Sequence, residues 1–336
     1  MVVLEKGSKM TGRKDSISRR DFIKNSIVGT TVLASTQVLA SCTSAAKSPP
    51  PQQKGHALRM GSPIFEKFDG PDAWVRVLKR LGYRAAYCPL GPEERDDVVN
   101  AYAKAAEKAD IIIAEVGAWS NPISPNEQMR KQAIKKCCEH LQLADRIGAS
   151  CCVNISGSRH EKQWAGPHED NLTKETFEMV VETTRAIIDD VKPTRTYFTL
   201  EAMPWSYPDS PDSYVRLIKA INRKRFAVHL DPVNFVCSPQ LYFNNAQLIR
   251  ECFGKLGPHI RSCHAKDIIL REDIYTPHLD EVRPGLGRMD YATFLTELSR
   301  FPDTPLMLEH LSNAEEYRSA AEHIRSVAKS VGLSFS

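Results

Sequence analysis

The segment FAVHLDPVNF, residues 226–235, is mostly apolar but carries three polar side chains, those of His229, Asp231 and Asn234. Its first residues, Phe-Ala-Val, are typical of a buried β-strand. A buried carboxylate without a partner costs several kcal/mol, so Asp231 needs a compensating group nearby. The segment therefore predicts a strand that ends in a polar site, to which other strands must contribute.

Seven further segments share these features, each being a short apolar run bounded by turn-forming residues. With the segment above they give eight expected strands: ALRMGSPIF (57–65), RAAYCPL (84–90), IIIAEVGAW (111–119), SCCVNISGS (150–158), TYFTLEAMPW (196–205), FAVHLDPVNF (226–235), IRSCHAKDII (260–269) and PLMLEHL (305–311). The longer segments between them have apolar residues at helical spacing, which predicts helices that alternate with the strands.

Local signals mark the ends of several of these helices. In the first, Pro71 suits the first helical position and Gly82 suits the end. Ser210 precedes a proline and is expected to cap another helix. Asn313 and Glu316 have the spacing of a capping box at the start of the last helix. Each signal places a helix between two expected strands.

Eight strand–helix alternations within residues 57–336 match the usual size of a (β/α)8 barrel. A doubly wound open sheet is the main alternative. That fold commonly carries a Gly-rich dinucleotide turn after its first strand, and the first expected strand here has none. The sequence therefore predicts a single (β/α)8 TIM barrel over residues 57–336.

The N-terminal 41 residues resemble a twin-arginine export signal. SRRDFIK (18–24) places paired arginines before the apolar stretch SIVGTTVLASTQVLA (26–40), which is too short for a spanning helix. The stretch runs into Leu-Ala-Ser-Cys, which resembles a lipobox and predicts lipidation at Cys42. The alternative is a disordered N-terminus with a chance Ser-Cys pair. We expect a signal peptide in 1–41, a Pro/Gln-rich tether in 42–56, and a periplasmic lipoprotein that contacts the membrane only through its lipid anchor.

The net charge of the chain originates in the same segment. Residues 1–41 carry seven Lys or Arg and three Asp or Glu residues, which accounts for the formal charge of +4. The remaining chain is neutral, so its charge gives no support for a nucleic-acid partner.

Nine cysteines in an exported protein would ordinarily suggest disulfides. Here two adjacent pairs, Cys137-Cys138 and Cys151-Cys152, lie inside apolar segments, and no spacing resembles a CxxC metal site. We expect these thiols to be small core residues.

In a (β/α)8 barrel the chemistry lies at the carboxyl ends of the strands. The fifth to eighth expected strands end in Glu201, Asp231, His264 and Glu309, at intervals of 30, 33 and 45 residues. Three carboxylates and one imidazole need a positive charge, and this ligand set suits one Mn²⁺, Mg²⁺, Co²⁺ or Zn²⁺ ion. The alternative is that each residue pairs with a local Lys or Arg. Four such residues in consecutive strands favour a metal site.

These four residues resemble the metal ligands of the xylose-isomerase-like TIM barrel superfamily, also known as the sugar phosphate isomerase/epimerase family. The superfamily includes ketose 3-epimerases, inosose dehydratases and apurinic-site endonucleases. The resemblance covers nearly all of residues 57–336 and includes DPVN (231–234), HAKD (264–267) and PGLGRMDY (284–291), the last being similar to the family's Pro-Gly-x-Gly loop. One position departs: Asn234 stands where ketose epimerases have a histidine, and we expect it to be a substrate contact.

The resemblance implies metal-assisted proton transfer beside a carbonyl of a sugar or keto-sugar, through an enediolate. Glu201 and Glu309 would remove and return the proton. Return to the opposite face gives epimerisation, return to a neighbouring carbon gives isomerisation, and loss of a β-hydroxyl gives dehydration. The leading expectation is a sugar isomerase or epimerase. The alternative is a lyase or dehydratase that uses Lys266 or His229 as the acid.

Two other function classes fit the sequence less well. A non-catalytic sugar-binding lipoprotein would retain the barrel, but it predicts lost ligands, whereas all four are present. Apurinic-site endonucleases of the superfamily use further histidines from strands two and three, where this chain has YCPLG and EVGAW. We therefore expect a small carbohydrate substrate and no nucleic acid.

Several residues near the strand ends have two interpretations each. Lys266 shares a face with His264 and is expected either to contact a substrate oxygen or to pair with a glutamate. His229 shares a face with Asp231 and is either a substrate or ligand contact or a core histidine. His310 should point away from the barrel interior.

Aromatic and loop residues complete the set of candidates. Trp119 and Trp205 follow strands and are expected to stack on a sugar, or else to plug the barrel mouth. Trp164 and His168 lie in the loop HEKQWAGPHEDN (160–171), a candidate lid in which His168 is a possible substrate contact. The role of Glu115 is left open.

Overall fold

The computed structural model describes residues 57–336, and eight of its strands form one sheet in the order β1-β10-β7-β6-β5-β4-β3-β2. All pairs in this sheet are parallel. The strands are β1 (Met60–Gly61), β2 (Ala85–Tyr87), β3 (Ile112–Gly117), β4 (Cys151–Asn154), β5 (Phe198–Glu201), β6 (Phe226–Leu230), β7 (Ile260–Ala265) and β10 (Leu306–Leu308). Each lies inside one of the eight expected segments, so the prediction of a single (β/α)8 barrel is confirmed.

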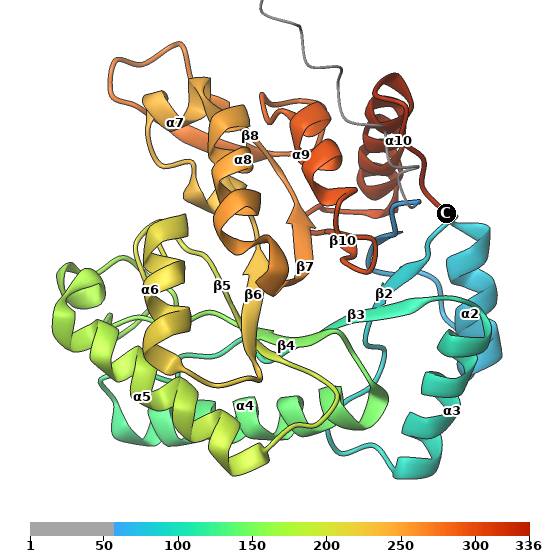
Figure 1. Cartoon of the computed structure of the whole chain (residues 1–336), viewed down its shortest axis with the longest axis horizontal. Coiled ribbons are helices and arrows are strands. Elements are labelled where there is room, and N and C mark those ends of the chain that lie inside the picture. Colours follow the sequence, from blue (N-terminus) through green and yellow to red (C-terminus); the bar gives the residue numbers. More distant parts are fainter. Residues whose placement is uncertain (1–56) are drawn as a thin grey trace, which may run out of the picture. The chain divides into compact units, whose positions relative to one another are not determined.

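Helices connect the strands and surround them on the outside (Figure 1). They are α2 (Pro71–Arg80), α3 (Asp96–Lys108), α4 (Glu127–Ile147), α5 (Lys174–Val191), α6 (Pro211–Ile221), α7 (Pro239–Phe243), α8 (Asn245–Leu256), α9 (Tyr291–Leu298) and α10 (Ala314–Ser330). Three short 3-10 helices, η1 (Glu169–Leu172), η2 (Val233–Phe235) and η3 (Gly257–His259), lie in the loops. The apolar stripes of the helices pack on the outer face of the strands and make one continuous core.

The expected helix caps are mostly present. Pro71 is the first residue of α2, and the Ser210 hydroxyl accepts a hydrogen bond from the backbone N–H of Ser213 at the start of α6. At α10 the Asn313 side chain accepts from two backbone N–H groups. The second hydrogen bond of the expected capping box, from the Asn313 N–H to the Glu316 side chain, is wrong, because the Glu316 carboxylate lies 3.0 Å from Arg283 Nε instead.

The barrel is nearly closed where its first strand meets its second. The Arg84 N–H donates to the Met60 carbonyl across this seam at 3.1 Å. A Cβ on Gly61 would lie 2.4 Å from the carbonyl oxygen of Ala85, so only glycine permits this approach. At the opposite end of β1, the Leu58 N–H donates to Ser334, which ties the C-terminal segment to the first strand.

The seventh expected strand is shorter than the sequence suggests. It ends at Ala265, and the chain then turns into an antiparallel hairpin of β8 (Asp267–Leu270) and β9 (Leu279–Val282). The Asp267 carboxylate explains the turn, because it accepts backbone hydrogen bonds from Gly285, Gly287 and Met289 at 2.8–3.1 Å. This carboxylate therefore holds the Pro-Gly-Leu-Gly loop beside the end of β7.

The eight cysteines within residues 57–336 are all free. Five of them are buried, as expected of core thiols, but Cys237 is exposed and does not fit that expectation. In this part of the chain no helix has both the length and the apolar character needed to cross a bilayer. The expected signal peptide, tether and lipidated Cys42 lie outside the described residues.

Candidate functional site

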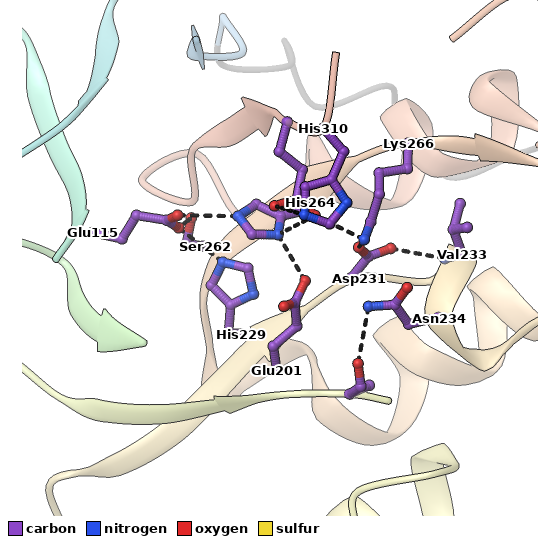
Figure 2. A network of polar contacts seen from close by, with 12 residues as sticks. Glu115, Glu201, His229, Asp231, Val233, Asn234, Ser262, His264, Lys266 and His310 are labelled. Atoms are coloured by element: carbon purple, nitrogen blue, oxygen red, sulfur yellow. Dashed lines mark hydrogen bonds and ion pairs between the residues drawn. The ribbon is translucent and has the colours of Figure 1, made fainter. Parts of the chain in front are cut away.

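The four predicted metal ligands meet at the carboxyl end of the barrel. Figure 2 labels three of them, Glu201, Asp231 and His264. Glu201 ends β5, Asp231 directly follows β6, His264 lies in β7, and Glu309 directly follows β10. One donor atom from each lies within 4.8 Å of the others, and all four side chains are buried. The parallel strands bring these side chains together because the carboxyl ends of all eight strands face the same side of the barrel.

The imidazole of His264 lies at the centre of the cluster. Its Nδ1 is 2.7 Å from Glu201 Oε1 and 2.9 Å from Glu309 Oε1. Burial alone would lower the pKa of His264, but the surrounding carboxylates, with Glu309 the strongest, raise it well above the usual range for histidine. Without a bound cation the ring is therefore the positive charge that balances these carboxylates.

Lys266 follows β7 and supplies a second positive charge. Its Nζ lies 2.8 Å from Glu309 Oε1, 2.9 Å from Asp231 Oδ2 and 3.5 Å from Glu281 Oε2, and the side chain is only 3% exposed. Of the two interpretations of Lys266, the structure thus shows the carboxylate pair, at a position beside the predicted ligands. Burial raises the pKa of Asp231 to about 7, although the ammonium opposes this effect.

Two of the carboxylate oxygens are suited to a cation. Asp231 Oδ2 and Glu309 Oε1 are buried and make only ion-pair contacts, without hydrogen-bond geometry, to residues in 57–336: both face Lys266 Nζ, and Glu309 Oε1 also faces His264 Nδ1 at 2.9 Å. A buried anionic oxygen without a hydrogen bond is costly. A divalent cation held by these two oxygens, Glu201 and His264 Nδ1 would satisfy them, and it would compete with Lys266. The residues present therefore fit a divalent metal ion.

A second layer of polar groups lies behind the imidazole, and Glu115 of β3 is its centre (Figure 2). Its Oε1 is 3.0 Å from His264 Nε2, while its Oε2 is 2.8 Å from His229 Nε2 and accepts a 2.9 Å hydrogen bond from Ser262 Oγ. Burial opposes ionisation, but His264 and His229 outweigh it and lower the pKa of Glu115, so the group is a carboxylate.

When a cation occupies the cluster of Glu201, Asp231, His264 and Glu309, this arrangement assigns a role to each nitrogen of His264. A carboxylate only accepts hydrogen bonds, so the Nε2 atom facing Glu115 must carry a proton. When the ring is neutral, Nδ1 is therefore the free ligand atom, and it faces Glu201 and Glu309. The sequence alone does not assign a role to Glu115. The feature that could have pointed to this role is the one that singled out Asp231, namely a lone carboxylate inside an apolar strand.

His229 does not lie where a substrate could reach it. Its side chain is fully buried, its ring packs edge-on against His264 at 4.1 Å between centroids, and its Nε2 bonds to Glu115. The structure thus shows His229 as a buried partner of Glu115 and of the predicted ligand His264, and it shows no exposed surface of this side chain that a substrate could contact.

The remaining predicted contacts lie around the mouth. Trp119 is half-buried, with its ring centroid 6.5 Å from that of His264, and Asn234 donates to the Ala202 carbonyl at 3.0 Å. Trp205 is exposed and its indole N–H donates to the Ala165 carbonyl at 2.7 Å. These contacts place Trp119 next to the cluster, whereas Trp205 supports the loop after β4.

Two histidines differ from expectation. His168 accepts a hydrogen bond from the Asp170 N–H at the start of η1, so the structure gives it a capping role and shows no contact with the cluster. His310 is exposed but does not point away from the site. Its Nδ1 lies 3.0 Å from Glu281 Oε1 and its Nε2 lies 3.6 Å from Glu309 Oε2, because a positive φ of 58° turns the backbone there.

Solved structures of other proteins share this fold at low sequence identity. A xylose isomerase-like TIM barrel protein from Mycobacterium smegmatis in complex with magnesium is 16% identical, with a TM-score of 0.57 over 82% of this chain and 96% of that one. D-psicose 3-epimerase from Clostridium cellulolyticum H10 with D-tagatose is 14% identical, with a TM-score of 0.59 over 82% and 100%. The apo form of 3-keto-D-glucoside 4-epimerase from E. coli is 13% identical, with a TM-score of 0.55 over 80% and 99%.

Comparison at the level of sequence gives the family. No curated protein sequence matches the chain significantly. The family model for the xylose isomerase-like TIM barrel matches residues 75–327, which is most of the chain and includes every predicted metal ligand. The chain therefore belongs to the xylose isomerase-like TIM barrel family.

Proposed function

We propose that this protein is a divalent-metal-dependent sugar isomerase or epimerase that transfers a proton beside a carbonyl of a sugar or keto-sugar. One observation carries the proposal. Two buried carboxylates, Glu201 and Glu309, flank the same imidazole nitrogen at 2.7 and 2.9 Å, within a cluster whose donors fit a divalent cation. Such a cluster offers two proton carriers next to an electrophile.

Structural relatives support a small carbohydrate substrate and a metal. Two of the solved structures above are sugar epimerases by name, one of them with D-tagatose, and a third holds magnesium. The neighbours share the fold at 13–16% identity, so they support the class of reaction and leave the sugar open.

Glu201 and Glu309 are the proposed proton carriers. The pKa of each lies below its usual range: burial opposes ionisation, but His264 and Lys266 outweigh burial, even though Glu309 also raises the pKa of Glu201. One residue reacts as the carboxylate and takes the proton from the carbon beside the carbonyl, while the other must enter as the carboxylic acid and gives its own proton to that carbon, so the pair carries one proton when the substrate binds. When bound, the cation supplies a Lewis acid that favours loss of this proton. Return from the opposite face inverts the carbon, which requires the two carboxylates to contact opposite faces of the sugar.

Lys266 supports the rival reaction. Its ammonium lies 2.8 Å from Glu309 Oε1, close enough for both groups to act on one substrate. In a lyase or dehydratase, a carboxylate would take the proton beside the carbonyl, and Lys266 would protonate the departing β-oxygen as the carbon–carbon double bond forms. In an epimerase the same ammonium would hydrogen-bond a substrate oxygen without giving up its proton.

Proton exchange tests the proposal. The full chain would be loaded with Mn²⁺ and incubated in D₂O with ketoses, inososes and 3-keto-glycosides, and NMR would locate deuterium and products. We expect deuterium at one carbon beside the carbonyl and its loss in Glu309→Gln. An unsaturated product that requires Lys266 would identify the lyase. Loaded protein that exchanges no proton in any of these sugars would contradict both reactions and favour a binding protein.

We also propose that the chain is exported by the twin-arginine route and anchored through Cys42. The support is the order of paired arginines, apolar stretch and cysteine in residues 18–42. Metabolic labelling with a radioactive fatty acid tests it. The native chain should be labelled in the membrane fraction and Cys42→Ser should not, whereas equal labelling of both chains would contradict the anchor.

A further inference from the structure

A hollow of about 320 Å³ opens beside Trp119, the half-buried tryptophan next to His264. It lies between the loop after β3, the first half of α4 and the loop after β4, and its lining includes Trp119, Gln132, Lys136 and Trp164. This volume is near the lower end for small-molecule pockets, so it suits one ring rather than a longer chain.

Trp119 connects the hollow to the cluster. Its ring centroid is 6.5 Å from that of His264, and the same side chain lines the hollow. Its position is fixed from two sides. A Cβ on Gly117 would lie 2.4 Å from the indole Nε1, so the glycine makes room for the ring, and Lys136 Nζ donates to the Trp119 carbonyl at 3.1 Å.

Trp164 forms another wall, and its loop is held in place although the indole itself is 44% exposed. Trp205 donates to the Ala165 carbonyl at 2.7 Å, and the Ser158 hydroxyl donates to the Gly166 carbonyl at 2.6 Å. A large indole that is exposed in a hollow, on a loop fixed by hydrogen bonds, is typical of a binding surface.

The chemistry of the lining points to a sugar ring. The C–H face of a pyranose packs on an indole, while its hydroxyl groups need both donors and acceptors. Trp119 and Trp164 supply indole surfaces, and the amide of Gln132 both donates and accepts. The only ammonium in the lining, that of Lys136, already bonds to a backbone carbonyl, so a phosphate is less well served than a neutral ring.

We propose that this hollow binds a second ring of the substrate, which makes the substrate a glycoside rather than a free monosaccharide. The ring to be deprotonated would lie at the cluster, and the ring linked to it would lie between Trp119 and Trp164. This inference rests on the proposed function, and it names the substrate class of that same site: keto-glycosides.

Binding of unreactive sugars tests the subsite separately from catalysis. Saturation-transfer NMR and calorimetry on the full Mn²⁺-loaded chain would compare glucose with the disaccharides cellobiose, maltose and trehalose. At least one disaccharide should bind about tenfold tighter than glucose or more. Trp164→Ala should bring its affinity down to about that of glucose, while Trp164→Phe should keep most of it because the ring face remains.

The controls separate the possible outcomes. Tyr197→Ala, at the opposite end of the barrel where the ring stacks on Arg225 and Arg261, should leave sugar binding unchanged. Equal binding of glucose and every disaccharide, or a disaccharide affinity unaffected by Trp164→Ala, would overturn the subsite. Preferential binding of glucose 6-phosphate that is lost in Lys136→Gln would also overturn it. Disaccharide binding that depends on Trp164, together with no proton exchange in any keto-glycoside, would uphold the subsite and refute the proposed reaction.

Discussion

Replacing Glu115 by glutamine should weaken metal binding although Glu115 is not a predicted ligand. The carboxylate accepts from three donors: Ser262 and His229 bond to Oε2, and His264 Nε2 faces Oε1. Glutamine has the same size but only one acceptor oxygen, and its NH₂ group is a donor. The amide oxygen should face the side with two donors, which leaves the NH₂ group opposite the N–H of His264.

The imidazole can relieve this conflict by moving its proton. If Nε2 becomes the acceptor for the new amide, the proton moves to Nδ1, the atom 2.7 Å from Glu201 Oε1 that is predicted to bind the cation. Either the proton blocks this ligand atom or two buried donors face each other. Loss of such an outer partner of a metal-bound histidine typically costs about 10- to 100-fold in metal affinity, or about 1.4–2.8 kcal/mol.

Calorimetric titration of the EDTA-treated full chain with Mn²⁺ measures this effect. We expect a Kd about 10- to 100-fold higher in Glu115→Gln, with circular dichroism unchanged. Ser262→Ala is the matched control, because it removes one donor to Glu115 and keeps the carboxylate; its Kd should change by less than about threefold. Native affinity in a folded Glu115→Gln protein would refute the reasoning.

Three further predictions concern the ammonium, the barrel seam and one surface carboxylate. Lys266→Met should bind Mn²⁺ more tightly in calorimetry, because the variant lacks the positive charge 2.9 Å from Asp231 Oδ2, and it should lose proton exchange. Weaker Mn²⁺ binding would contradict the competition between Lys266 and the cation for this oxygen. Gly61→Ala should lower the free energy of unfolding by about 1–3 kcal/mol in urea, because the new Cβ meets the Ala85 carbonyl at 2.4 Å, and an unchanged urea midpoint would contradict the tight seam. Burial of Asp145 would raise its pKa, but the backbone N–H donors of residues 194–196 outweigh burial and lower it. The carboxylate therefore stabilises the fold above its unfolded pKa of about 3.9, and this contribution is lost as the pH falls further. In urea, the difference in unfolding free energy between the native chain and Asp145→Asn should shrink from pH 6 to pH 3, and a constant difference would contradict this assignment.

Local information in the sequence was enough to predict the barrel. Each strand is an apolar run with its own boundaries, and a helix cap such as Ser210 acts over three residues. The meeting of Glu201, Asp231, His264 and Glu309 followed from the same local reading, because parallel strands in a barrel all place their carboxyl ends at one face. Neither prediction required knowledge of which side chains contact one another.

Only the tertiary structure decided what lies behind and beside those four residues. Glu115 and His264 are 149 residues apart, on strands that are not hydrogen-bonded neighbours, and they meet across the barrel interior. Alternation along a strand gives the face on which a side chain lies, but the partner it meets there depends on the register and tilt of all eight strands. For the same reason the sequence does not reveal the turn after β7, which buries Lys266 against Asp231. This turn depends on the hydrogen bonds that Asp267 accepts from the loop of residues 284–287. The sequence by itself thus determined the barrel and the place of its candidate metal centre, and the packing across the interior determined which charges meet there.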